Sequence, residues 1–293
     1  GVLDLVTTAL YTAKKLGKNT YFEFKQDNLA EIDRKAHVLD VLKKTIKNNS
    51  FELHYQPYFN IQTGELVAFE ALCRVVDGND YIAPEEFIKI AEDNNVIWEV
   101  DKSAMAGACK MLAVFQDMGI RTGISVNVSP ISFMNQEFIP EIEKLLKRYK
   151  IFTNSLMVEL TETAFIESFS RAKDVITALS ELGIRLMLDD FGKGYSNLLA
   201  VMKLNVDTLK FDKSLIDEIE DIRSNIIVKK MIEIADTFNM KVIAEGIETR
   251  MQFEELKRMN CTMGQGFLFG KPMAYEEVFP FIRSHGNILD LAE

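Results

Sequence analysis

Residues 156–190, LMVELTETAFIESFSRAKDVITALSELGIRLMLDD, contain a predicted strand, a predicted helix and a second predicted strand. The runs Leu156–Leu160 and Arg185–Asp189 are short and rich in aliphatic residues, as buried strands are. Between them, Ser168–Leu182 carries apolar residues at helical spacing. Because parallel strands need a long crossover, usually a helix, this stretch predicts a β–α–β unit.

The same alternation continues on both sides of this unit. Further strands are predicted at Glu52–Tyr58, Leu66–Arg74, Gly123–Val128, Thr208–Phe211, Lys241–Ala244 and near Thr262–Phe269, and further helices at Gln136–Tyr149, Asn225–Phe238 and Arg250–Met259. The last helix is preceded by Thr249 with Gln252 three residues on, a capping-box pair. This alternation predicts an α/β fold, a TIM-type (β/α)8 barrel. Because the short, hairpin-like segment 60–64 joins the first two strands, we expect one strand to run antiparallel to the rest.

The composition excludes several classes of protein. The chain has 293 residues, with 34 Lys and Arg against 44 Asp and Glu, a net charge of −10. Such an acidic chain repels phosphate backbones, so we expect no DNA or RNA polymer as a partner. We also expect a cytoplasmic domain, since no apolar run reaches about 20 residues and no signal-peptide pattern opens the chain. An anchor upstream in the native protein stays open. The three cysteines are far apart and are expected to be reduced.

Polar residues stand within or at the ends of the predicted strands, where the chemistry of such a barrel is located. They are Glu70, Asn127, Glu159, Asp189, Asp190, Lys210, Glu245 and Gln265. Carboxylates gathered at one barrel mouth would take up protons unless cations neutralised them. Oxygen ligands of this kind suit Mg²⁺ or Mn²⁺ rather than zinc. Asp189 and Asp190 can both reach the mouth only if the strand ends between them; alternatively, they cap a helix.

The chain from about residue 40 to 285 resembles the EAL domain, the cyclic di-GMP phosphodiesterase family. The resemblance is carried by Tyr55-Gln56-Pro57, Glu70-Ala71-Leu72, Asn127-Val128-Ser129, Glu159-Leu160-Thr161-Glu162, Asp189-Asp190-Phe191-Gly192-Lys193-Gly194-Tyr195-Ser196, Leu209-Lys210-Phe211-Asp212, Ala244-Glu245-Gly246-Ile247-Glu248-Thr249 and Gln265-Gly266-Phe267-Leu268-Phe269-Gly270-Lys271-Pro272. These motifs come in the family's order. One departure is Lys193, where the family usually has Thr or Ala.

The resemblance implies a role for each of these residues. Glu70, Asn127, Glu159 and Asp189 would hold one Mg²⁺ or Mn²⁺ ion, and Asp190 would share a second with Asp189. Ca²⁺ is expected not to support the reaction, since its longer bonds misplace the water. Lys210 would orient the attacking water, and Glu245 would be a metal ligand or a base. The remaining assignments are substrate contacts from Gln56, Leu72, Arg74 and Gln265, loop support from Glu162 and support of the site from Glu248.

The implied reaction is hydrolysis of cyclic di-GMP to linear 5′-pGpG, with two metals assisting in-line attack of water. A second interpretation is a non-catalytic receptor for cyclic di-GMP. A third treats Lys210 as a Schiff-base lysine of an aldolase, which a crowd of carboxylates disfavours because it keeps the amine protonated. A scaffold that uses the barrel only for protein contacts has no supporting feature. We expect a homodimer.

The first residues resemble the end of a different domain. Leu3–Leu16 is predicted as a helix, Thr20–Phe24 as a strand, and residues 25–35 as a linker or connecting helix. The stretch Ala9–Asn19 resembles the last helix of a diguanylate cyclase (GGDEF) domain, although the GGDEF loop itself is absent. We therefore predict a GGDEF-like remnant and linker at 1–35, an EAL barrel at 36–293, and an upstream GGDEF or sensory domain in the native protein.

Overall fold

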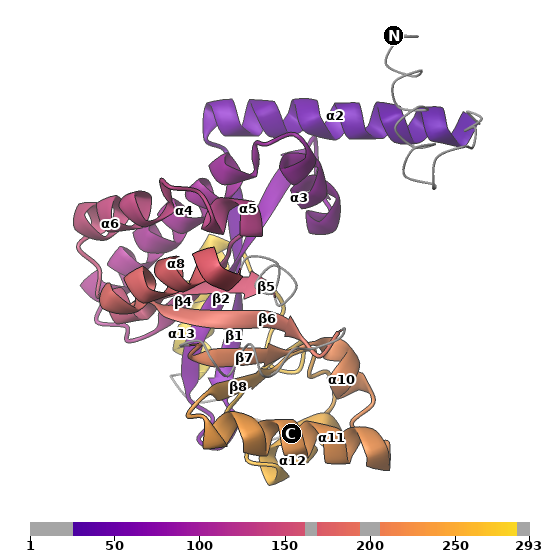
Figure 1. Ribbon diagram of the computed structural model, residues 1–293, viewed down its shortest axis with the longest axis vertical. Coiled ribbons are helices and arrows are strands. Elements are labelled where there is room, and N and C mark those ends of the chain that lie inside the picture. The colour runs from indigo at the N-terminus through magenta and orange to yellow at the C-terminus, as the bar shows by residue number, and fades with distance from the viewer. Residues whose placement is uncertain (1–25, 162–168, 194–205, 286–293) are drawn as a thin grey trace.

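The computed structural model describes residues 26–161, 169–193 and 206–285 (Figure 1). Its strands are β1 (Glu52–Asn60), β2 (Leu66–Asp77), β3 (Asp80–Ile82), β4 (Gly123–Asn127), β5 (Leu156–Thr161), β6 (Arg185–Phe191), β7 (Thr208–Phe211), β8 (Lys241–Ala244) and β9 (Met263–Gln265). Its helices are α2 (Gln26–Asn48), α3 (Pro84–Asp93), α4 (Ile97–Asp117), α5 (Pro130–Phe133), α6 (Phe138–Tyr149), η1 (Thr153–Ser155), α8 (Phe169–Glu181), α10 (Lys213–Asp217), α11 (Ile222–Thr237), α12 (Arg250–Arg258) and α13 (Tyr275–His285).

The strands close into a barrel, as the sequence predicts. The order is β1-β9-β8-β7-β6-β5-β4-β2-β3, and a further pairing of β1 with β2 closes the ring. Strand β1 is antiparallel to both of its neighbours, β2 and β9, whereas neighbouring strands from β4 to β9 are parallel. The expectation of one antiparallel strand is therefore confirmed. The short strand β3 lies outside the ring, because it pairs with β2 alone.

Every predicted strand of the described residues is present, and the capping box at the start of α12 is confirmed. There, Gln252 N donates to Thr249 Oγ1 (3.1 Å), and Thr249 N donates to Gln252 Oε1 (3.0 Å). The sequence did not predict the helices α3, α4, α5, η1, α10 and α13 or the short strand β3. The predicted helix and strand before residue 25 lie outside the described residues.

Apolar side chains from six strands fill one layer of the barrel interior. They form a single buried cluster, although they come from strands all around the ring: Tyr58, Ala68, Met157, Met187, Ile243 and Met263. A larger core lies between the outside of the sheet and the helices that surround it. The interior is therefore a packed core, and the charged cluster lies above this layer, toward the carboxyl ends of the strands.

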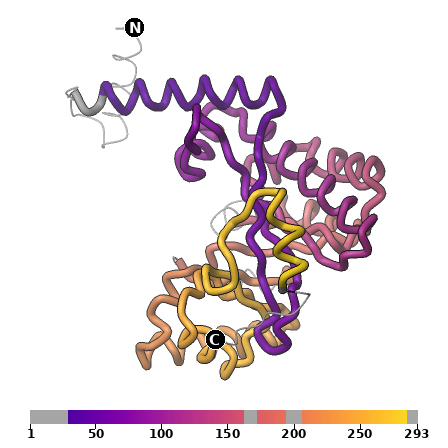
Figure 2. The backbone as a smooth tube through the Cα atoms, turned by 180° about the vertical axis from the view of Figure 1, so that it is seen from behind, coloured from indigo at the N-terminus to yellow at the C-terminus, as the bar shows by residue number. Residues whose placement is uncertain are grey.

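Helix α2 is attached to the barrel by its second half. Val38, Val41 and Leu42 pack in a separate small core with Val75 of β2 and Phe87 of α3. The first half of α2 extends beyond the barrel and is mostly exposed (Figures 1 and 2). The predicted division between residues 35 and 36 falls inside this helix and stays a prediction. No helix within the described ranges is both long and apolar enough to cross a membrane.

Candidate active site

The polar residues of the interior follow from the two-residue period of the strands. In β2, for example, Ala68 belongs to the apolar layer and Glu70 lies two residues further toward the carboxyl end. In β5 the same step leads from Met157 to Glu159. The polar layer built in this way contains Gln56, Glu70, Asn127, Glu159, Asp189, Lys210, Glu245 and Gln265. The sequence-predicted strand-end residues thus meet at one mouth of the barrel.

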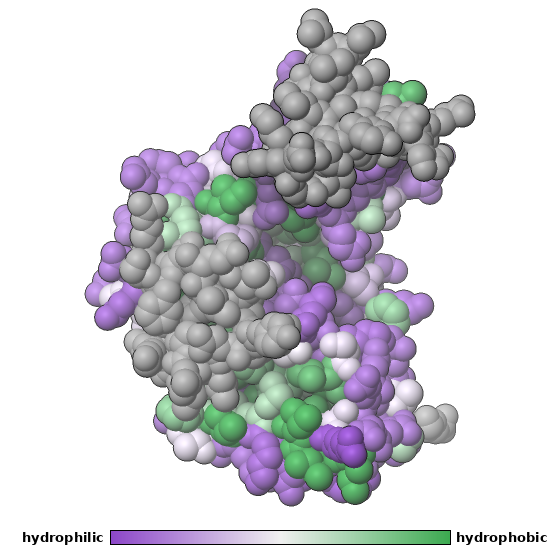
Figure 3. Space-filling view, turned by 45° about the vertical axis from the view of Figure 1, so that its right-hand side comes forward, coloured by the Kyte–Doolittle hydropathy of each residue, from purple (hydrophilic) through white to green (hydrophobic). Residues whose placement is uncertain are grey.

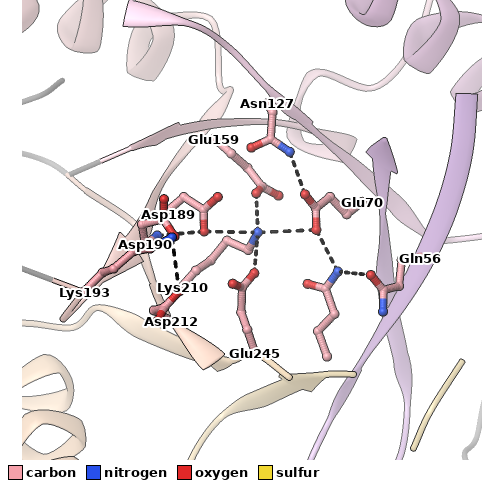
Figure 4. A network of polar contacts seen from close by, with 11 residues as sticks. Gln56, Glu70, Asn127, Glu159, Asp189, Asp190, Lys193, Lys210, Asp212 and Glu245 are labelled. Atoms are coloured by element: carbon pink, nitrogen blue, oxygen red, sulfur yellow. Dashed lines mark hydrogen bonds and ion pairs between the residues drawn. The ribbon is translucent and has the colours of Figure 1, made fainter. Parts of the chain in front are cut away.

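The Lys210 ammonium lies at the centre of this layer (Figure 4). Its Nζ atom is 2.7 Å from Glu245 Oε1, 3.4 Å from Glu70 Oε2 and 3.4 Å from Asp189 Oδ1. It also contacts Glu159 Oε2, and its side chain is only 1% exposed. Burial alone would lower the pKa of Lys210, but these four carboxylates raise it well above its ordinary value. An amine held so firmly as an ammonium is a poor Schiff-base nucleophile, which argues against the aldolase interpretation.

A line of amides holds the Glu70 carboxylate in place. Asn127 Nδ2 donates to Glu70 Oε1 (2.6 Å), and Gln265 Nε2 donates to Glu70 Oε2 (2.7 Å) and to Gln56 Oε1 (3.2 Å). Gln56 Nε2 in turn donates to the carbonyl of Gly270 (3.2 Å). Burial raises the pKa of Glu70, but Lys210 and these hydrogen bonds together bring it below its usual value. Glu70 is therefore the carboxylate of the cluster best prepared to stay ionised.

The other carboxylates show that the cluster has too little positive charge. Burial, together with repulsion from neighbouring carboxylates, raises the pKa of Glu159 and of Asp189, despite the ammonium beside them. Burial likewise raises the pKa of Glu245 to about 8. A single lysine cannot balance four carboxylates, two of them buried and two half-buried, so cations or protons must supply the difference.

The residues present fit a divalent cation in their donor chemistry. Among the described residues, no three Asp, Glu, His or Cys side chains form a ready-made metal cluster, and the carboxylates instead converge on Lys210. However, Glu159 Oε1 is buried with no hydrogen-bond partner among the described residues, and the donors are carboxylate and amide oxygens. Hard oxygen donors with excess negative charge are what Mg²⁺ and Mn²⁺ require.

Asp189 and Asp190 reach the mouth in a way that the sequence did not predict. The strand does not end between them, because β6 continues to Phe191. Instead, the pairing with β7 is irregular between Leu188 and Phe191, and Asp190 has a left-handed backbone (φ 56°). Such a bulge redirects a side chain without ending the strand. Both aspartates lie inside the strand, so neither caps a helix.

Lys193 pairs with the acidic residues beside it. Its Nζ atom lies 3.2 Å from Asp190 Oδ1 and 3.9 Å from Asp212 Oδ2, and the side chain is 64% exposed. Asp212 was not predicted as part of the site; it also caps α10 by accepting from Ser214 N (2.9 Å). Lys193, the residue that departs from the usual family pattern, thus places its positive charge beside Asp190.

Two cavities adjoin the polar layer. The larger one, of about 560 Å³, lies beside β2 and β4 and is lined by Leu72, Arg74, Asn127 and Glu159, among others. The smaller one, of about 300 Å³, is lined by Gln56, Lys210, Glu245, Glu248 and Gln265, among others. Figure 3 shows a hollow on one face of the molecule with apolar residues at its base. The cluster around Lys210 therefore lies between two spaces that differ in size.

Asp101 is a site residue that the sequence analysis missed. It projects from α4 into the larger cavity, where Asp101 Oδ2 accepts from Ser129 N (2.9 Å). Ser129 Oγ donates to Glu92 Oε1 (2.6 Å), so a second acidic residue stands nearby. Burial raises the pKa of Asp101 to about 7. The available signal was an aspartate on the buried face of a helical pattern that includes Ile97, Val100 and Ala104.

The remaining predicted residues lie as follows. Arg74 is half-buried, and its Nη1 atom donates to the carbonyl of Cys73 (3.1 Å). Its guanidinium has no ion-pair partner within the described ranges. Glu248 is bound by Lys213 at the rim of the smaller cavity, away from the Lys210 cluster. Glu162, the predicted support of the loop after Asp190, lies outside the described residues.

Comparison with known proteins gives the class to which this fold and site belong. The EAL domain family matches residues 39–272, which is most of the chain, so the chain belongs to the EAL domain family. The resemblance stated from the motifs is therefore confirmed.

Individual relatives align with nearly the whole chain. The signaling protein YkoW of Bacillus subtilis (strain 168) is 34% identical over 278 residues, covering 94% of this chain and 34% of YkoW. The bifunctional diguanylate cyclase/cyclic di-GMP phosphodiesterase MucR of Pseudomonas aeruginosa is 31% identical over 273 residues, covering 92% of this chain and 40% of MucR. The chain thus spans between a third and two fifths of the length of these curated relatives.

Solved structures are similar over most of the fold. The MucR phosphodiesterase structure, a complex with cyclic di-GMP, is 31% identical with a TM-score of 0.78, covering 83% of this chain and 99% of that one. The EAL enzyme Bd1971 with cAMP and cyclic di-GMP bound is 26% identical with a TM-score of 0.81, covering 96% of this chain and 75% of that one.

Proposed function

We propose that this protein is a metal-dependent phosphodiesterase that hydrolyses cyclic di-GMP to linear 5′-pGpG. The observation that carries the proposal is the cluster of four carboxylates around Lys210, placed between two cavities. The names of MucR and of the cyclic di-GMP phosphodiesterases NbdA and PdeR support the substrate and the reaction. So does the cyclic di-GMP complex of the MucR structure.

The roles of the residues follow from their charges and hydrogen bonds. Mg²⁺ or Mn²⁺, when bound, supplies a nucleophile at neutral pH and balances the charge of the phosphate. Glu70, Asn127, Glu159, Asp189 and Asp190 would hold two such ions, with Glu245 as a further ligand or as the base. Lys210 Nζ donates from the centre of the cluster, where it would orient the attacking water. The Glu245 carboxylate, 2.7 Å from Lys210 Nζ, would be placed either to accept a proton from that water or to join the ligands.

The larger cavity offers complementary chemistry to a guanine base. Leu72 supplies an apolar wall, and the Asp101 carboxylate can accept from two adjacent N–H groups, as the N1 and N2 edge of guanine requires. The Arg74 guanidinium, on the same wall and without an ion-pair partner among the described residues, can pair with a phosphate. On the other side of the cluster, Gln56 and Gln265 line the smaller cavity. A dinucleotide could therefore occupy both spaces with one phosphodiester at the cluster.

The test is incubation of the protein with cyclic di-GMP and Mg²⁺, followed by chromatography of the products. We expect linear pGpG to appear, and to be absent when the metal is chelated. A Glu70→Gln variant serves as the matched negative control, since it keeps the size and most hydrogen bonds of Glu70. Tight binding of cyclic di-GMP without any product would instead support the non-catalytic receptor.

Two further expectations accompany this proposal. We propose that the protein is a homodimer, which sedimentation of the purified chain tests directly. We also propose that in the native protein a GGDEF or sensory domain precedes the barrel and that the barrel works in the cytoplasm.

A further inference from the structure

A third cavity lies at the opposite end of the barrel from the Lys210 cluster. Its volume is about 530 Å³, and it is bounded by the end of α4, the segment 119–122, η1 and the first residues of β4 and β6. In Figure 1 the arrowheads of β5 and β6 point away from this end. No residue of the proposed phosphodiesterase site lines it.

The cavity is basic, although the protein as a whole is acidic. Two arginines line it, Arg121 and Arg185, and among the described residues no aspartate or glutamate does. Within the described ranges, neither guanidinium has a carboxylate within ion-pair distance. In a chain with a net charge of −10, two such arginines facing one space create a local site for an anion.

Arg185 also carries a polar atom that the protein leaves unsatisfied. Its Nη2 atom donates to the carbonyl of Asn154 (3.0 Å), which fixes the guanidinium at the cavity wall. Its Nε atom is buried and has no hydrogen-bond partner. A buried donor without an acceptor is costly, but Nε is closed off from the cavity, so an anion there would pair with the outer N–H groups of the guanidinium.

Part of the remaining wall is apolar, with an aromatic ring at its edge. Leu112, Phe115 and Ile120 contribute aliphatic and aromatic surface, and Phe152 is 67% exposed. Gln116 holds the segment that carries Phe152: its Nε2 atom donates to the carbonyl of Lys150 (3.1 Å), and its Oε1 atom accepts from Phe152 N (3.1 Å). The ring is thus attached to a fixed backbone, where it can stack on a flat ligand.

We propose that this cavity binds a small aromatic anion, a planar ring that carries a phosphate or a carboxylate. The anionic group pairs with Arg121 and Arg185, and the ring packs against Phe152 and the apolar wall. The site is separate from the proposed function and does not depend on it, because the two share no residue.

The experiment is isothermal titration calorimetry on the full chain, with cyclic di-GMP present at saturation and EDTA added to prevent turnover. The probes are AMP, benzoate, inorganic phosphate and uncharged adenosine. We expect AMP or benzoate to bind with a Kd below about 1 mM, and phosphate and adenosine to bind at least tenfold more weakly. A preference for AMP identifies the anionic group as phosphate, and a preference for benzoate identifies it as carboxylate.

Two exposed substitutions locate the binding. Arg121→Gln and Phe152→Ala are each expected to weaken the preferred probe at least fivefold, whereas Arg223→Gln on the exposed face of α11 leaves it unchanged. Circular dichroism confirms that each variant is folded. The proposal is overturned if neither aromatic anion binds, if phosphate alone binds equally well, or if Arg121→Gln has no effect.

Discussion

The two ends of the same strands carry opposite chemistry. Strand β4 runs from Gly123, beside the basic cavity, to Asn127 in the polar layer, and β6 runs from Arg185 to Asp189. At the carboxyl ends, four buried or half-buried carboxylates surround one ammonium. At the amino ends, two arginines face a space that no carboxylate of the described residues lines. The charge that a residue contributes here depends on whether it lies at the amino or the carboxyl end of its strand, not on which strand it belongs to. One end requires cations, and the other can accept an anion.

The largest effect should come from removing one carboxylate at the cation-requiring end. We expect Glu70→Gln to lower cyclic di-GMP hydrolysis by about 10³-fold or more, equivalent to about 4 kcal/mol in the barrier, because it deletes a proposed metal ligand. Product chromatography measures the rate. Lys241→Gln, an exposed change at the start of β8, is the control at the other end and should keep normal turnover. Near-normal hydrolysis by folded Glu70→Gln protein would refute the metal assignment.

Asp101, in the larger cavity at the carboxyl ends of the strands, should make the stability of the protein depend on pH. The pKa of Asp101 is about 7 in the folded protein, against an ordinary value of 3.8. Between about pH 4 and pH 7 the folded state keeps a proton that the unfolded state has lost. The free energy of unfolding therefore falls as pH rises, by at most about 1.4 kcal/mol per pH unit, and levels off above pH 7.

Asp101→Asn removes this contribution and leaves those of the other carboxylates. Urea unfolding at pH 5, 6, 7 and 8 should show a flatter decline for the variant than for the wild type, with the difference confined to pH values below about 7. Parallel profiles would mean that Asp101 titrates normally.

Metal binding should stabilise the protein through the same end. At about 100 times its Kd, Mg²⁺ adds about 2.7 kcal/mol to the free energy of unfolding, which raises Tm by several degrees. Mn²⁺ should act similarly, and Ca²⁺ should not support hydrolysis. In Glu159→Gln the gain should shrink, whereas in Lys241→Gln it should persist. Thermal unfolding with NaCl at equal ionic strength separates binding from screening, and an equal gain with NaCl would contradict specific binding.

A smaller effect is expected at Arg74, beside the larger cavity. Lysine keeps the charge but cannot form two parallel hydrogen bonds to a phosphate. We expect Arg74→Lys to weaken cyclic di-GMP binding about tenfold, or about 1.4 kcal/mol, without changing Mg²⁺ binding. Calorimetry measures both affinities. If neither changes, Arg74 contributes only to the structure of β2.

The smallest effect should come from Lys193, which is exposed. Exposed ion pairs of this kind are worth about 0.2–1 kcal/mol. Lys193→Thr should therefore shift the Mg²⁺ concentration for half-maximal hydrolysis by no more than about fivefold. Rates across a Mg²⁺ titration test this, and superimposable curves would show that Lys193 plays no part in the site.

The polar layer could be predicted from sequence because it depends on a local period. Once Met157 and Met187 are assigned to strands, Glu159 and Asp189 must lie two residues further on the same face. The central position of Lys210 could not be predicted in this way, since it depends on how far its side chain reaches across a closed ring. Nor could the bulge at Asp190, which depends on one backbone angle.

Other features depend on contacts between distant parts of the chain. Helix α4 is buried over much of its surface, so its apolar residues are not confined to one face and give a weak amphipathic pattern in the sequence. Asp101 belongs to the larger cavity only because α4 packs beside β4. The basic cavity joins Arg121 to Arg185, which are far apart in sequence. Local patterns carry no information about such pairs.

Helix α2 extends beyond the barrel, and its geometry fixes how a segment joined to its first residue is oriented relative to the barrel. Each residue of an α-helix advances about 1.5 Å and turns about 100°. The second half of α2 is fixed against β2 and α3. Each residue of the first half therefore has a fixed position along the helix axis and a fixed direction around it, relative to β2. Inserting one residue near Gln26 would turn whatever is attached there by more than a quarter of a circle. Inserting seven residues would nearly restore the direction around the helix axis and would change only the distance along it.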